Sequence, residues 1–330
     1  MIKKECFTAE WIEQVSSELH YNDKNLIEKV IRALSLLEML VKAGCPLVFK
    51  GGTALMLILG KSAHRLSIDI DLICPPGTNI EDYLKSFADF GFINLELVER
   101  KQRDDADIPK SHSKFFYQIA YRNDTDAQSY ILLDVLYEDI HYFRTQQIAI
   151  NCPFIRLEGK PLMVTVPSAE DILGDKLTAF APNTTGIPYY RNGRSCSMEI
   201  AKQLYDVGRL FENVSDLQIT KEAFRKIAVV ELSYRSFGTD IGQVFNDIRQ
   251  TALCISTRGK AGEGDFDLIQ DGIIRVKSFM YKQRYLIDHA IIDAARAAYL
   301  ATLIEKGINE IESYSNNPAD IKDMVIRPSL

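Results

Sequence analysis

The spacing of apolar residues changes once along the chain, at Pro167 and Ser168, and this change limits the folds that the sequence can adopt. Before it, segments with helical spacing alternate with short segments typical of strands. After it, almost every segment has helical spacing. The sequence therefore predicts an α+β fold, in which a domain with a small mixed sheet over residues 1–168 is followed by a mainly helical domain over residues 169–330.

The individual elements follow from the same spacing. Two helices are expected within residues 8–43 and a short one over 54–59, with strands over residues 47–49, 66–73, 95–99, 115–122 and 130–137. A helix over about residues 80–90 and a further β segment within 148–166 complete the first domain. Ser168 is the expected N-cap of the next helix, and later helices are expected over residues 200–211, 221–232, 241–254, 266–280 and 285–304.

Composition and charge exclude several classes of protein. Apolar residues make up 46% of the 330 residues and charged residues 25%, which is typical of a globular protein and not of a disordered one. The net charge is −6, so any binding of nucleic acid depends on a local patch and not on an overall positive field. The six cysteines lack CxxC spacing and the five histidines lack HxxxH or HxH spacing, so we expect reduced thiols and no zinc site.

The sequence also indicates where the protein acts. The N-terminus lacks the apolar run of a signal peptide. No apolar stretch approaches the roughly 20 residues that cross a bilayer. We therefore expect a cytoplasmic protein without a membrane partner.

The segment over residues 50–72 carries the strongest chemical signal. Gly51 and Gly52 lie at the end of a predicted strand, where they let the backbone approach phosphate oxygens, and the helix that follows offers unpaired N–H groups. Asp69 and Asp71 share one face of the next predicted strand, and their oxygens are uncomfortably close unless a hard cation such as Mg²⁺ lies between them. Together these two motifs predict a site for an anion and a divalent metal ion.

This pattern resembles the nucleotidyltransferase superfamily of the polymerase-beta type, in which Gly-Gly or Gly-Ser precedes an acid–apolar–acid triplet. A third carboxylate on a later strand usually completes that set. Asp134, in the apolar run over residues 131–136, is the candidate here. A solvent-facing acid at the end of a strand is the alternative interpretation of Asp134, and Glu138 and Asp139 are the other candidates.

More closely, the chain resembles the AbiEii/AbiGii toxin branch of that superfamily over roughly residues 45–212, in the segments KGGTAL, RLSIDIDL, EDILGDKLTAF and QLYDVGRLF. That family has a lysine on one helix and an aspartate on the next at its active site, and these match Lys176 and Asp206. The resemblance gives Lys176 the task of neutralising triphosphate charge, and the alternative is a surface pair with Glu170 or Asp175. Asp206 contacts substrate, or instead orients Lys176 or anchors Arg209.

The resemblance implies transfer of a nucleoside monophosphate from an NTP to tRNA, another RNA or a protein, opposed by a cognate antitoxin. One or two Mg²⁺ ions, or Mn²⁺ in their place, are expected on Asp69, Asp71 and Asp134. The nucleotide would contact residues from both motifs and the later helices: Gly51, Gly52, Thr53, Arg65, Ser67, Lys176 and Asp206.

Other functions remain open at this point. The same fold serves as a nucleotide-sensing module without catalysis, and a small-molecule nucleotidyltransferase acting on an antibiotic or a sugar phosphate has the same chemistry. The loop over residues 188–194 joins two tyrosines to two arginines, which suits base stacking and phosphate binding as well as an ordinary surface loop.

Overall fold

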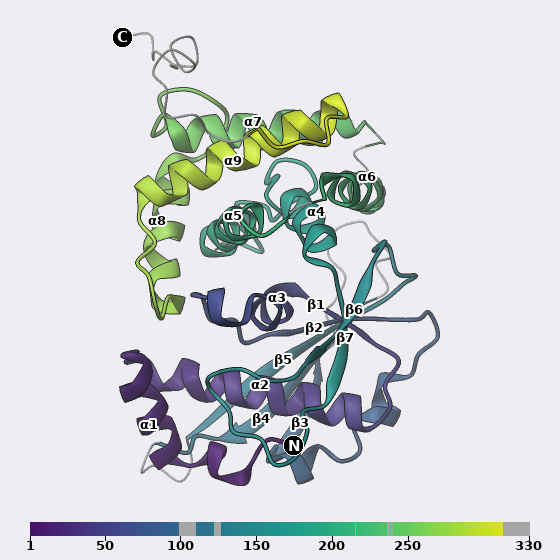
Figure 1. Cartoon of the computed structure of the whole chain (residues 1–330), viewed down its shortest axis with the longest axis vertical. Coiled ribbons are helices and arrows are strands. Elements are labelled where there is room, and N and C mark those ends of the chain that lie inside the picture. Colours follow the sequence, from purple (N-terminus) through teal and green to yellow (C-terminus); the bar gives the residue numbers. More distant parts are fainter. Residues whose placement is uncertain (99–109, 122–126, 215, 236–237, 239, 313–330) are drawn as a thin grey trace.

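The computed structural model describes residues 1–98, 110–121, 127–214, 216–235, 238 and 240–312. The chain has the α+β architecture that the sequence predicts, with a small mixed sheet in its first half and a mainly helical second half (Figure 1). No helix among these described residues is long and apolar enough to cross a membrane.

The first half builds a mixed sheet in the order β1-β2-β5-β4-β3, in which β2 and β5 are parallel and the other neighbours are antiparallel. The strands are β1 (Val48–Lys50), β2 (Ile70–Cys74), β3 (Asn94–Val98), β4 (Lys110–Gln118) and β5 (Gln128–Tyr137). The helices are α1 (Ala9–Leu19), α2 (Lys24–Lys42) and α3 (Gly51–Leu59), and β6 (Thr145–Ala149) pairs with β7 (Met163–Pro167) in a separate ribbon.

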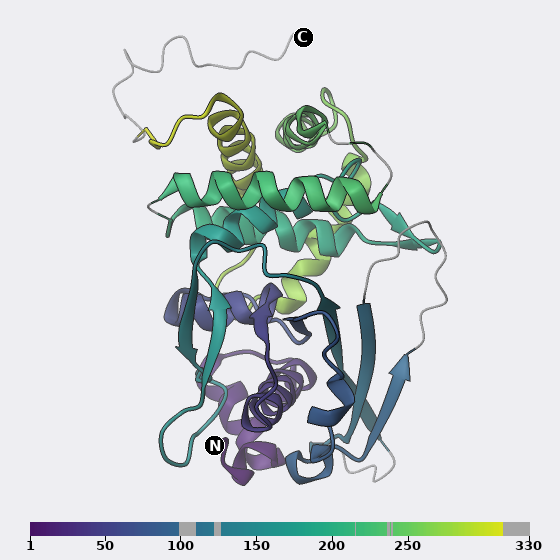
Figure 2. The same ribbon diagram turned by 90° about the vertical axis from the view of Figure 1, so that its right-hand side faces the viewer.

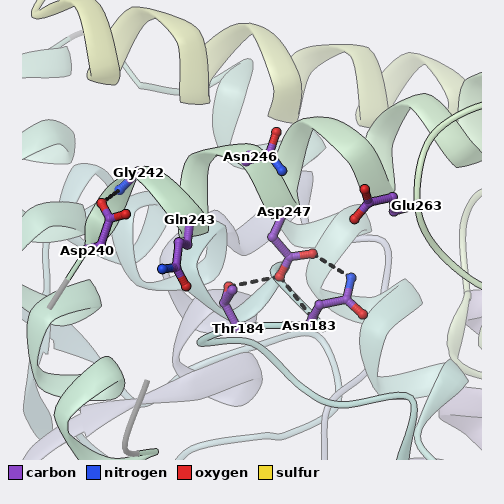
Figure 3. Close-up of a pocket in the computed structure, with 8 residues that line it drawn as sticks. All are labelled: Asn183, Thr184, Asp240, Gly242, Gln243, Asn246, Asp247 and Glu263. Carbon is purple, nitrogen blue, oxygen red and sulfur yellow. Dashed lines mark hydrogen bonds between the residues drawn. The ribbon is translucent and has the colours of Figure 1, made fainter. Parts of the chain in front are cut away.

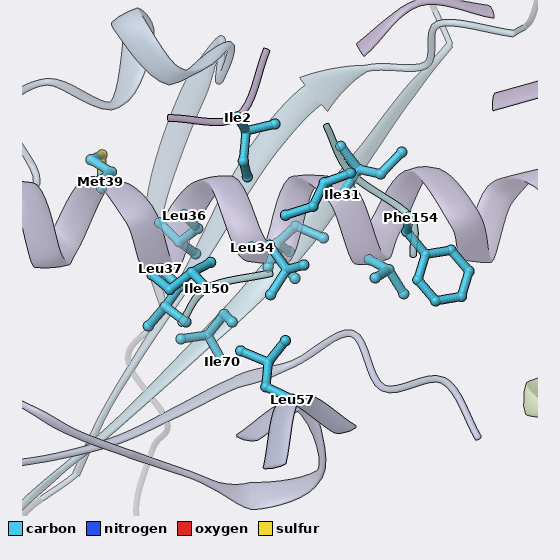
Figure 4. Close-up of a cluster of buried hydrophobic side chains, with 14 of the residues drawn as sticks. Ile2, Ile31, Leu34, Leu36, Leu37, Met39, Leu57, Ile70, Ile150 and Phe154 are labelled. Atoms are coloured by element: carbon cyan, nitrogen blue, oxygen red, sulfur yellow. The ribbon is translucent and has the colours of Figure 1, made fainter. Parts of the chain in front are cut away.

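Helix α2 covers one face of the sheet and forms the first apolar core. Ile31 and Leu34 of α2 pack with Ile70 of β2 and with Ile150 (Figure 4). Alternate residues of β5, such as Leu133, are buried on this same face. Because side chains alternate along a strand, the residues between them point to the opposite face. That face carries a small apolar cluster at one end, with Val48, Ile73 and Leu136, and charged side chains next to it; it is called the polar face below.

The second half consists of helices α4 (Ala169–Ala179), α5 (Ser197–Phe211), α6 (Leu217–Tyr234), α7 (Ile241–Ser256), α8 (Phe266–Val276) and α9 (Ile287–Lys306), with a small hairpin of β8 (Tyr190–Arg191) and β9 (Arg194–Ser195). Ser168 caps α4 by accepting a hydrogen bond from the Asp171 amide at 3.1 Å, as predicted. Helix α3 lies between the two halves (Figures 1 and 2). Leu57 of α3 packs into the first core and Leu55 into the helical one, so this helix connects them.

The predicted helix over residues 80–90 is wrong. The segment forms two 3₁₀ turns, at Ile80–Tyr83 and Phe87–Phe90. Side chains of α2 take up the carbonyl groups at its end, since Ser35 donates to the Phe90 carbonyl at 3.2 Å and Arg32 donates to the Gly91 carbonyl at 3.1 Å. These bonds anchor the end of the segment to α2, a contact between distant parts of the chain that the apolar spacing of residues 80–90 does not report.

The predicted strand over residues 66–73 begins only at Ile70. Leu66 is drawn away from the sheet because its amide donates to the Phe279 carbonyl at 2.8 Å. Asp69 therefore lies just before β2 and not within it. Residues 99 and 122, at the ends of two other predicted strands, lie outside the described residues.

Candidate active site

Four charged or ionisable side chains lie side by side across the polar face. The register of the sheet places Lys50 of β1 opposite Asp71 of β2, Asp71 beside Asp134 of β5, and Asp134 opposite His112 of β4. Directly paired residues of neighbouring strands point to the same face. We call these four residues the charged row.

The glycine pair lies directly against this row. Gly51 has a φ of +80°, and a Cβ atom at this position would lie 2.1 Å from the Asp71 carboxylate. A Cβ atom at Gly52 would lie 2.6 Å from the Ser67 hydroxyl. Position 51 therefore requires glycine, whereas a side chain at position 52 would displace Ser67, and the predicted Gly-Gly and Asp-x-Asp motifs meet in space.

The start of α3 offers backbone N–H groups at the same place. Lys50 immediately precedes the helix, and its side chain makes no capping hydrogen bond. The first amides of α3 therefore keep their affinity for an anion. Thr53 acts differently from the expectation, because its side chain is fully buried and its hydroxyl donates to the Asp69 carbonyl at 2.7 Å. This bond fixes the backbone that carries Asp69.

The carboxylates of this site repel one another. Burial raises the pKa of Asp71 to about 7, and the negative charges of Asp69 and Asp134 add to the rise. Burial also raises the pKa of Asp69, although the nearby ammonium group of Lys202 opposes the shift. A bound cation would remove both penalties, so the donor set fits a hard divalent ion.

Asp134 has a partner that the sequence did not indicate. His112 Nδ1 lies 2.5 Å from Asp134 Oδ1, while the carboxylate of Asp134 stays 36% exposed. Within the described part of the chain, no three acidic, histidine or cysteine side chains gather closely enough to form a ready-made metal cluster. The charge of Asp69 raises the pKa of Asp71 more than the charge of Asp134 does, and Asp134 lies beside Asp71 on the next strand with His112 at its carboxylate.

Lys176 and Asp206 come together with Arg65 in a buried group, called here the ion cluster. Arg65 binds both carboxylate oxygens of Asp206, at 2.8 Å each, and Lys176 lies 3.1 Å from the same carboxylate. Lys176 also donates to Gln203 at 2.9 Å. The arrangement matches the proposed role of Asp206 in orienting Lys176.

Two alternative partners, Asp175 for Lys176 and Arg209 for Asp206, pair with other residues. Asp175 lies 3.9 Å from Lys50 and accepts a hydrogen bond from Tyr142 at 2.7 Å. Arg209 pairs with Glu212 at 2.8 Å and not with Asp206. Lys176 is therefore a buried lysine that points from α4 towards the site, and its charge acts on Asp71.

Lys202 is a further cation of the site that the sequence did not indicate. Its ammonium lies 3.7 Å from the centre of the Phe279 ring, and burial, followed by the charge of Arg65, lowers its pKa to about 8. Lys202 precedes Asp206 by one helical turn, and this spacing was the signal in the sequence that could have placed it on the same face.

A separate pocket lies away from these residues, between α7 and the chain that follows α4 (Figure 3). Its volume is about 330 Å³, and none of the predicted site residues lines it. Its buried carboxylate, Asp247, accepts hydrogen bonds from the amide and side chain of Asn183 and from Thr184. These bonds satisfy Asp247 and fix the turn after α4, so we assign the pocket no chemistry.

Comparison with known proteins shows which family model this chain matches. A model described as "Nucleotidyl transferase AbiEii toxin, Type IV TA system" matches residues 34–299, a range that includes every predicted site residue. The structure of JHP933 from Helicobacter pylori is 17% identical and aligns over 85% of this chain and 94% of its own, with a TM-score of 0.43. A proposed nucleotidyltransferase from H. pylori is also 17% identical, over 86% and 94% of the two chains, with a TM-score of 0.42. No curated protein sequence matches.

Proposed function

The chain belongs to the AbiEii family of nucleotidyltransferase toxins of type IV toxin–antitoxin systems, and on this premise we propose that it transfers a nucleoside monophosphate from an NTP to an acceptor, with pyrophosphate as the other product. One observation carries the proposal, namely that Gly51 and Gly52 pack directly against Asp71 and Ser67. An uncapped helix start and a pair of repelling carboxylates in one place suit a triphosphate and its cation.

Asp69, Asp71 and Asp134 are the residues that would hold Mg²⁺, or Mn²⁺ in its place, and a bound ion would neutralise the phosphates and activate the attacking hydroxyl. The amides at the start of α3 bind the outer phosphates. Ser67 lies beside Gly52, where its hydroxyl can donate to the same phosphates.

The cations around the site act on the charge that develops during transfer. Lys176 is held in place by Asp206, and Lys202 lies near Asp69. Both ammonium groups come from the helical half, so they approach the phosphates from the side opposite the sheet. Fixed positive charges in a buried site stabilise the phosphates in the transition state more than in water.

The acceptor is a hydroxyl group of tRNA, of another RNA or of a protein. Family membership also predicts a cognate antitoxin that prevents the reaction. We expect that antitoxin to act on the assembled site or on access to it, because the site residues come from both halves of the chain.

A labelling experiment tests the proposal. The purified chain is incubated with Mg²⁺, each α-labelled NTP and total tRNA, and label is followed into RNA and protein. The Asp69→Asn/Asp71→Asn variant should lose the label, whereas Asp82→Asn/Asp89→Asn should keep it, because these two carboxylates are exposed on the same half of the chain. Absence of both label and Mg·NTP binding would leave the chain as a non-catalytic member of its family. A parallel incubation contains an antibiotic or a sugar phosphate in place of tRNA, and label on that small molecule alone would contradict the macromolecular acceptor.

A further inference from the structure

An aromatic and basic surface continues the polar face beyond the charged row. Tyr130 of β5 pairs with Phe116 of β4, and Lys114 of β4 lies between that pair and His112. Residues two apart on a strand share a face, so these side chains point to the same side as Asp134. Together with Lys29 of α2, we call Lys114, Phe116 and Tyr130 the aromatic platform.

The contacts of this platform are aromatic and cationic. The ring centres of Phe116 and Tyr130 are 5.7 Å apart. The ammonium groups of Lys29 and Lys114 lie 5.6 Å and 5.5 Å from the centre of the Tyr130 ring. Lys114 also pairs with Glu96 at 3.5 Å, and Tyr130 is 40% exposed. A tyrosine ring with two lysine ammonium groups near it is therefore accessible from solvent on the sheet that carries the site.

We propose that the aromatic platform binds the bases and phosphates of a single-stranded RNA acceptor next to its reacting end. The inference rests on the function proposed above and names a subsite for it. Exposed aromatic rings stack with bases of any sequence, and neighbouring lysines contact the phosphates. The chain is acidic overall, so binding of RNA needs such a local patch.

The position of the platform relative to the site supports this direction of approach. The NTP phosphates are expected on the β1 side of the sheet, at the start of α3, whereas the platform lies on the β5 and β4 side. Asp134 lies between the two. Tyr130 is four residues from Asp134 along β5, a span of about 13 Å at the usual rise of a strand. An RNA strand stacked on Tyr130 can thus extend its end to Asp134.

Lys29 connects the two regions electrostatically. Its charge acts on Asp69, although its ammonium lies over Tyr130. The platform and Asp134 also share one face of β5, where Tyr130 and Asp134 are four residues apart.

Fluorescence anisotropy of a labelled, short single-stranded RNA of mixed sequence tests the inference on the full chain without NTP. Tyr130→Val keeps a strand-forming residue but removes the ring, and we expect the dissociation constant to rise roughly 5- to 100-fold. Tyr130→Phe keeps the ring and should keep the affinity. Phe143→Val is the matched control, because Phe143 is 49% exposed and has the ammonium group of Lys226 5.6 Å from its ring centre, and this variant should bind RNA as the unchanged chain does.

The salt dependence separates the lysines from the ring. Lys29→Gln/Lys114→Gln should reduce the slope of log affinity against log salt concentration by about 1.4, which is two single-strand phosphate contacts. Tyr130→Val should leave that slope as it is, because the ring carries no charge. Circular dichroism checks that each variant is folded.

The outcomes distinguish this inference from the proposed function. If no labelled product forms with any acceptor while Tyr130→Val weakens RNA binding and Tyr130→Phe does not, the RNA surface stands and the transfer reaction falls. If label reaches an acceptor while Tyr130→Val binds RNA as the unchanged chain does, the reaction stands and this surface is overturned. Equal weakening in Tyr130→Val and Tyr130→Phe, weakening only in Phe143→Val, or no RNA binding at all also overturns it.

Discussion

The charged row and the ion cluster both bring buried charges together, but they balance these charges differently. In the ion cluster, Asp206 has two cations within 3.1 Å, because Arg65 and Lys176 both contact its carboxylate. In the charged row, the burial of Asp71 and its two carboxylate neighbours raise its pKa to about 7.

This difference separates a carboxylate whose charge the protein balances from carboxylates that keep an affinity for a cation. A carboxylate whose charge the protein itself balances stabilises the fold and loses its affinity for further cations. Carboxylates that the fold holds near one another without enough positive charge store an unfavourable interaction that a ligand can relieve. The ion cluster therefore joins the two halves of the chain and orients Lys176, and the charged row is where a metal ion and a nucleotide are expected.

Substitution of Asp71 gives the largest expected effect. Asp71→Asn should lower the rate of nucleotide transfer by roughly 10³- to 10⁴-fold, about 4 to 5.5 kcal/mol, because a hard oxygen ligand is lost. The melting temperature should stay the same or rise, since the variant removes a repelled, buried charge. Activity and thermal unfolding are measured on the same preparation. Loss of stability together with loss of activity would contradict the distinction between the charged row and the ion cluster.

In the ion cluster we expect a loss of stability instead. Asp206→Asn leaves Arg65 and Lys176 buried without a balancing charge, so the free energy of unfolding in urea should fall by about 3 to 4 kcal/mol. The matched control is Asp288→Asn, because Asp288 pairs with Arg258 at 2.9 Å while both side chains are more than half exposed. That surface pair should contribute less than about 1 kcal/mol. Equal losses in the two variants would show that burial of the pair does not decide its strength.

Asp293 tests whether carboxylates of the helical half are always balanced. It is buried near Arg209 and Arg296, yet burial raises its pKa to about 6. The folded chain thus keeps this proton up to about pH 6, whereas the unfolded chain releases it near pH 4. The folded state binds more protons between these values, so stability falls as the pH rises through this window.

Comparison with Asp293→Asn isolates this effect. The free energy of unfolding of the unchanged chain, minus that of the variant, should decrease by about 2 kcal/mol between pH 4 and pH 7. Urea unfolding at several pH values gives the free energy of unfolding of both proteins. A difference that is constant over this range would mean that the two arginines balance Asp293 after all, as Asp206 is balanced.

Much of the fold follows from local pattern. The strands and most helices are predicted because apolar spacing reports directly on which side of an element is buried, and Ser168 marks the start of α4. The helix predicted over residues 80–90 is absent, and this could not be predicted from local spacing. Side chains of α2, distant in sequence, bind the carbonyl groups at the end of that segment.

The candidate site also contains residues that local sequence indicates and residues that only the structure identifies. Gly51, Gly52, Asp69 and Asp71 are recognisable because they are close in sequence and their spacing has a chemical meaning. Lys50 and His112 are part of the charged row only through the register of the sheet, which brings together strands that are about 20 to 60 residues apart. No local pattern gives that register, so partners across strands are found only in the structure.

His112 allows the smallest of these effects to be measured. As a residue that positions Asp134, it should affect turnover without being essential. His112→Phe keeps a ring but removes the nitrogen that contacts Asp134, and we expect kcat to fall roughly 10-fold, about 1.4 kcal/mol, as for partners of metal-binding residues in general. His112→Asn places an amide where Nδ1 lies and should recover part of that loss, because a donor to the carboxylate is restored. If the two variants have the same kcat, His112 only fills space on the polar face, and the charged row then ends at Asp134.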